Sequence, residues 1–131
     1  MSSAEDVARS ILGDAQVEET KASVTEFNAD WEDYLSRTAG SIWSREGLDR
    51  RTKSAVTLAL LTALGREEEL AVHVRVGLRN GLTPHEISEI LIHTSLYAGV
   101  PFVRAAFAIA GGVVGQEPAA PPEESSSPPA G

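Results

Sequence analysis

The chain has 131 residues, 42% of them hydrophobic, and this length allows one domain with one core. Its formal charge of -8 at pH 7 argues against a nucleic-acid partner, because phosphate binding needs a clustered basic surface. The absence of cysteine excludes disulfides, thiolate metal sites, cysteine nucleophiles and redox Cys-x-x-Cys motifs.

The N-terminal segment is acidic and leads into no long apolar run, so it does not resemble a secretory signal. We therefore expect a cytoplasmic protein. Ser3 is placed to cap a short helix that ends at Gly13, and a polar connection should follow it.

A second helix is predicted where apolar residues recur at three- and four-residue spacing. These residues are Val24, Phe27, Trp31 and Leu35. We expect the two aromatic side chains to lie in the core and the helix to end between residues 37 and 40. A loop bounded by glycines should then cover residues 40–48, anchored by Ile42, Trp43 and Leu48.

The third predicted helix begins after Asp49, a good N-cap, and its first turn carries Arg50, Arg51 and Lys53. Cations are unfavourable at a helix N-terminus, so this turn is either reserved for an anion or simply solvated. From residue 55 to 64 apolar residues surround the whole helix, and a partner subunit would be needed to cover them. The same segment is too short to span a bilayer, so no membrane partner is expected.

A helix over residues 66–79 places Glu69 and His73 one turn apart between two apolar stripes. Asn80 and Gly81 should end it, and Thr83 with Glu86 forms a capping box for the next helix. The result is a central helix-turn-helix. Glu69 and His73 are either a buried acid/base pair or an ordinary contact at a helix edge.

The next helix is predicted over residues 84–98, with Ile87, Ile90, Leu91 and Thr94 facing inward. In this helix His93 is more simply a core or interface residue than a catalytic one, and His85 should be exposed. The last helix, 102–114, should pack through Phe107, Ala110 and Val114.

No strand pattern occurs, so the fold is predicted to be all-α, with one helical domain over residues 1–114. Residues 115–131 hold five of the seven prolines, three consecutive serines and no large apolar residue. This composition is typical of a disordered tail.

Several segments in this order and spacing resemble the 4-carboxymuconolactone decarboxylase family. They are 47–54 (GLDRRTKS), 64–70 (LGREEEL) with 73–75 (HVR), 80–89 (NGLTPHEISE) and 97–101 (YAGVP), with weaker likeness at 11–14 (ILGD) and 25–27 (TEF). The resemblance covers nearly all of residues 11–114. Peroxidase relatives of this fold carry a thiol pair where this chain has Arg66 and Glu69, so peroxidase chemistry is excluded.

The resemblance implies an alkylhydroperoxidase-like all-α fold that assembles as a ring-shaped homo-oligomer, a hexamer or trimer, without cofactor or metal. It also implies a reaction in protocatechuate degradation. In that reaction a small dicarboxylate lactone, 4-carboxymuconolactone, loses carbon dioxide and becomes β-ketoadipate enol-lactone.

Within this interpretation His73, kept protonated by Glu69, is the candidate general acid. The candidates to bind the substrate carboxylates are Arg50, Arg51 and Lys53. The chain departs from the family pattern in a 37–43 loop one residue shorter than usual, and at two candidate pocket residues. There His93 stands in place of an expected glutamine and Arg104 in place of an expected asparagine.

These departures leave room for two alternatives. One is a cofactor-free decarboxylase, isomerase or cyclase that acts on a different unsaturated lactone or ketone. The other is a non-catalytic oligomeric helical module, which the basic turn and the Glu69–His73 pair argue against.

Overall fold

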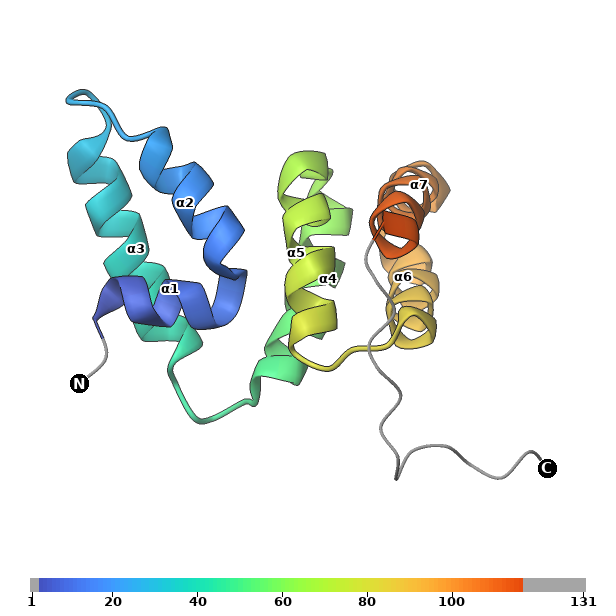
Figure 1. The fold of residues 1–131 in the computed structure, drawn as a ribbon. Coiled ribbons are helices and arrows are strands. Elements are labelled where there is room, and N and C mark those ends of the chain that lie inside the picture. Colours follow the sequence, from blue (N-terminus) through green and yellow to red (C-terminus); the bar gives the residue numbers. More distant parts are fainter. Residues whose placement is uncertain (1–2, 117–131) are drawn as a thin grey trace.

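The computed structural model describes residues 3–116, and within this range the fold has seven helices and no strand (Figure 1). The helices are α1 (Ala4–Leu12), α2 (Asp14–Ala22), α3 (Ala29–Trp43), α4 (Arg50–Leu64), α5 (Glu67–Arg79), α6 (Pro84–Ala98) and α7 (Val100–Gln116). The all-α prediction is confirmed. Helix α7 runs two residues beyond its predicted end, and the rest of the predicted tail, 117–131, lies outside the described residues.

The core lies among α4, α5, α6 and α7, which pack on one another and form one side of the molecule in Figure 1. Its buried apolar side chains come from all four helices and the α5–α6 turn. They are Leu58, Leu70, Val74, Leu82, Ile87, Leu91, Val103, Ala106, Ala110 and Val113. On α7 Ala110 is buried as predicted, but Phe107 is 38% exposed and Val114 only partly buried, so the inward face agrees with the prediction only in part.

Three predicted helix starts are confirmed by their hydrogen bonds. Ser3 and Thr83 each form a full capping box, and the Asp49 carboxylate accepts the Thr52 N–H at 2.7 Å. Gly81 takes a φ of 100° at the turn between α5 and α6, a conformation that a side chain would strain. The central helix-turn-helix is thus set by local sequence.

The N-terminal part departs from prediction in two places. The expected polar connection after Gly13 is a helix, α2, which is joined to α1 by ion pairs of Arg9 with Asp14 and Glu18. Helix α3 begins later and ends later than predicted, so that Trp43 is its last residue. Gly40 lies buried inside it, where a Cβ would lie 3.6 Å from Val7. The actual loop covers only residues 44–49.

The two aromatic side chains predicted for the core, Phe27 and Trp31, do not lie in it. Phe27, in the turn before α3, is 99% exposed. Trp31, in α3, is 57% exposed and contacts Tyr34, with 5.9 Å between ring centroids. The reason is that α3 packs mainly on α1, while the core forms among α4–α7. Figure 1 shows α1, α2 and α3 grouped apart from those helices.

Helix α4 buries only one of its faces within the chain. Leu58 is fully buried, but Leu60 is 56% exposed and Leu64 is 64% exposed. The all-round apolar pattern of this helix therefore finds no complete cover within residues 3–116. No helix in this range has the length and apolar character to cross a membrane.

Candidate active site

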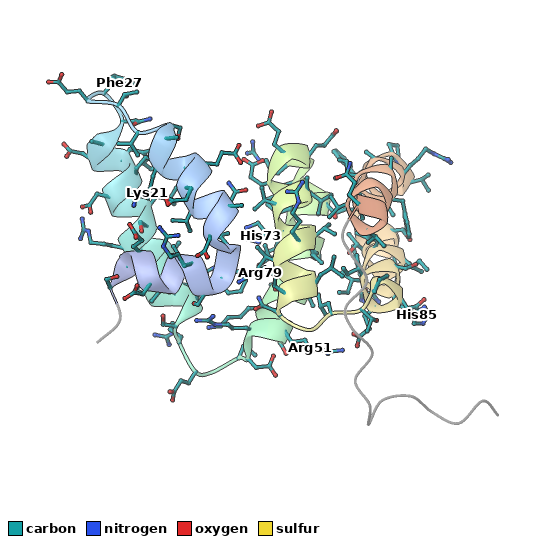
Figure 2. The ribbon with its side chains drawn as sticks, in the orientation of Figure 1. Lys21, Phe27, Arg51, His73, Arg79 and His85 are labelled. Atoms are coloured by element: carbon teal, nitrogen blue, oxygen red, sulfur yellow. The ribbon has the colours of Figure 1, made fainter. Side chains whose placement is uncertain are left out.

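His73 is the most unusual polar residue of the described chain. It lies on the side of α5 that faces α1, as does Arg79, which donates to the Arg9 carbonyl oxygen at 3.4 Å (Figure 2). The ring is half-buried, and its Nδ1 is fully buried with no hydrogen-bond partner among residues 3–116. Since buried polar atoms are normally satisfied, an unpaired one marks a candidate for ligand contact or catalysis.

Glu69 does not share this burial. Its side chain is exposed and forms no hydrogen bond to His73, so the predicted buried acid/base pair is not present in this form. Burial lowers the pKa of His73, and the charge of Glu69 raises it by a smaller amount. The prediction that Glu69 keeps the free imidazole protonated is therefore wrong, because desolvation outweighs the carboxylate.

Trp43 covers the imidazole. The two rings are stacked, with 13° between their planes and 6.1 Å between their centroids. The sequence placed Trp43 in a loop as an apolar anchor and gave no sign of this contact, since the two residues lie far apart in the chain.

A hollow of about 370 Å³ lies beside Trp43, between the end of α3 and the start of α4. It is lined by Trp43, Ser44, Arg45, Glu46, Leu48, Asp49 and Arg50. Two guanidinium groups, those of Arg45 and Arg50, can bind carboxylates here in a bidentate way. Glu46 opposes such binding, whereas the Asp49 carboxylate is engaged as the cap of α4.

Of the three predicted carboxylate-binding cations, only Arg50 lines this hollow. It is half-buried and donates to the Ser10 hydroxyl at 2.9 Å, with no carboxylate partner in the described chain. Arg51 is paired with Glu86. Lys53 donates to the carbonyl oxygens of Ile42 and Trp43 at the end of α3 and of Arg45 in the loop that follows, so its three donors are already used.

His93 and Arg104 do not join this site within one chain. Both are exposed, on α6 and α7, and neither lines the hollow; His93 contacts Tyr97, with 5.7 Å between ring centroids. His85 is exposed near the start of α6, as predicted (Figure 2). Among residues 3–116 no three His, Asp or Glu side chains are grouped so that they could hold a metal ion.

The model of the carboxymuconolactone decarboxylase family matches residues 29–111, which include Trp43, Arg45, Arg50 and His73. The chain belongs to this family. It is 44% identical over 106 residues to a 4-carboxymuconolactone decarboxylase of Acinetobacter baylyi, covering 80% of this chain and 79% of the relative. The family resemblance inferred from the sequence motifs is thereby confirmed.

Two further relatives are more distant. A nitrosuccinic acid decarboxylase of Metarhizium robertsii is 34% identical over 96 residues, covering 72% of this chain and 67% of its own length. An uncharacterized 15.0 kDa protein of Paracoccus denitrificans is 34% identical over 87 residues, 65% of each chain. Two of the three relatives are thus named as decarboxylases, of different acids.

Proposed function

We propose that this chain is a carboxy-lyase that converts 4-carboxymuconolactone to β-ketoadipate enol-lactone in protocatechuate degradation. The observation that carries the proposal is the 44% identity, over four fifths of the chain, to a relative named for this substrate. The candidate site supports it independently, because two guanidinium groups and one half-buried imidazole suit a dianionic acid that needs a proton.

The chemistry requires no external electron sink. The leaving carboxylate sits on a ring carbon that is vinylogous to the lactone carbonyl. When the bond to this carboxylate breaks, its electron pair moves into the ring as a dienolate and carbon dioxide leaves. One proton then adds to carbon to give the product. The protein must therefore bind two carboxylates, stabilise a developing oxyanion and deliver a proton.

In this proposal Arg45 and Arg50 bind the carboxylates, and His73 donates the proton. Because burial lowers its pKa, His73 is largely neutral in the free protein at neutral pH. A bound dianion adds negative charge beside the ring and favours the imidazolium, so substrate and proton would bind together. Trp43 would then keep water away from the protonated ring.

Two further parts of the proposal concern assembly and location. A homo-oligomer, a trimer or hexamer, would cover the apolar side chains that α4 exposes, and it could bring His93 or Arg104 of one subunit to the site of another. We also propose that the reaction takes place in the cytoplasm.

The test is an assay of the purified full chain on 4-carboxymuconolactone, following carbon dioxide release and identifying the product by mass spectrometry and NMR. We expect turnover to β-ketoadipate enol-lactone without added metal or cofactor. Nitrosuccinic acid, the acid in the name of the second relative, serves as the comparison substrate. A protein that decarboxylates only this second acid, or neither one, would contradict the proposal.

A further inference from the structure

Lys53, a half-buried lysine, makes an uncommon set of contacts. Its Nζ donates to the carbonyl oxygens of Ile42 at 3.1 Å, Trp43 at 2.9 Å and Arg45 at 2.5 Å. The last carbonyl groups of a helix lack intrahelical partners and carry the negative end of its dipole, so a cation there is favourable. Lys53 thus joins the end of α3 to the first turn of α4.

These contacts also explain part of the basic first turn of α4. A cation at this N-terminus is unfavourable for α4 itself, but its charge lies on the C-terminus of α3 instead. The three donors of an ammonium group can point at three converging carbonyl oxygens, which the planar fork of an arginine cannot do.

Two of the tethered residues belong to the candidate site. Trp43 stacks on His73, and Arg45 lines the hollow together with Arg50. Helix α3 packs mainly on α1, so few other contacts fix the position of its C-terminal end relative to α5. The position of the Trp43 ring over the imidazole therefore depends on the Lys53 tether.

We propose that Lys53 is a positioning residue, which holds Trp43 against His73 and Arg45 at the hollow and does not itself bind the substrate. The kinetic consequence rests on the decarboxylase function proposed above, whereas the structural consequence does not. Loss of the tether should let Trp43 leave the imidazole and admit water to it. The site would then keep its residues but lose their arrangement.

The protonation of His73 can be measured directly. Burial lowers the pKa of this imidazole, and the charge of Glu69 raises it. On two helices that pack against α5, Arg9 of α1 and Arg50 of α4 are engaged with other partners. An imidazolium quenches the fluorescence of an indole stacked on it. Trp31→Phe leaves Trp43 as the one fluorescent indole, because the chain has two tryptophans.

The experiment compares Lys53→Met and Lys53→Arg in the full-length Trp31→Phe protein, without substrate. In the parent, Trp43 emission should fall as the pH drops through the pKa of His73, and His73→Gln should abolish this step. Both Lys53 variants should lose most of the step and show emission at longer wavelength with stronger acrylamide quenching. Lys21→Met, which removes a lysine paired with Glu5 and Glu18, should keep the step.

Kinetics supply the second readout. In both Lys53 variants kcat should fall by about tenfold or more, with a smaller change in KM, because the reacting groups are misplaced. If Lys53→Met fails to fold, Lys53→Arg decides the question. It keeps the positive charge that a direct substrate ligand would need, so a loss of kcat in this variant indicates a positioning role.

Two results would overturn the inference. One is an unchanged Trp43 titration with a raised KM, which would make Lys53 a substrate ligand. The other is an unchanged titration with only a lower urea midpoint, which would make the tether merely structural. A protein without decarboxylase activity would leave the fluorescence result valid, so the two proposals fail separately.

Discussion

His73 is subject to two opposed influences, burial that lowers its pKa and the Glu69 carboxylate that raises it. Glu69→Gln removes the second, so the pKa should fall further and less imidazolium should be available at a given pH. We expect the alkaline limb of kcat/KM to move to lower pH, with turnover partly recovered in acid. Glu68→Gln, the matched change at the neighbouring exposed carboxylate, should leave the profile unchanged.

The same burial makes the stability of the fold depend on pH. The folded state holds His73 with a pKa below its ordinary value of 6.5, so the unfolded chain binds more protons between the two pKa values. The free energy of unfolding should therefore fall as the pH drops from about 6.5 through the folded pKa. Urea titrations at several pH values should show a smaller fall for His73→Gln; an equal fall would contradict the burial of this imidazole.

At the scale of single residues, the sequence indicated His73 and Arg50 as candidate site residues, because the neighbours that suggested them lie close by in the same helix. It did not predict Trp43 above His73, since that contact joins α3 to α5 through tertiary packing alone. It also named Lys53 as a candidate to bind the substrate carboxylates, although its partners are backbone carbonyl oxygens that no residue type reveals.

Among the helical elements, the α4–α5 connection depends most strongly on one residue. Gly65 has a φ of 70°, and a Cβ there would lie 2.9 Å from the Phe102 ring. Gly65→Ala should destabilise the protein by about 1–2 kcal/mol, since a left-handed residue with a side chain is strained even without the contact. Gly111→Ala, in a helix where a Cβ meets open space, should instead stabilise by about 0.5–1 kcal/mol, and urea unfolding measures both.

The helices themselves differed in how far sequence could predict them. Those with caps and apolar periodicity, such as α5 and α6, were predicted nearly to the residue because Thr83 and Gly81 act locally. Helix α2 was missed because only Val17 is buried in it, and its ion pairs to Arg9 of the preceding helix are not visible in a pattern of apolar residues. The extension of α3 to Trp43 was missed because Gly40 was taken as a helix boundary, although it lies buried inside the helix.

For the whole molecule, the main consequence concerns assembly. Leu60 and Leu64 are more than half exposed on α4. Monomeric proteins rarely expose large apolar patches of this kind. Light scattering at micromolar concentration should detect an oligomer, and Leu60→Glu should dissociate it. Asp30→Lys, a charge change on exposed α3 surface, serves as control. A monomeric parent protein would contradict the proposed assembly.

The most direct test of the account is turnover of 4-carboxymuconolactone by His73→Ala, measured together with its folded fraction. If His73 donates the proton, turnover per folded molecule should fall by about 10² to 10⁴. If His73 only packs beneath Trp43, the variant should lose stability while its folded fraction turns over normally. Near-parental turnover from well-folded His73→Ala would contradict the assignment of His73 as the proton donor.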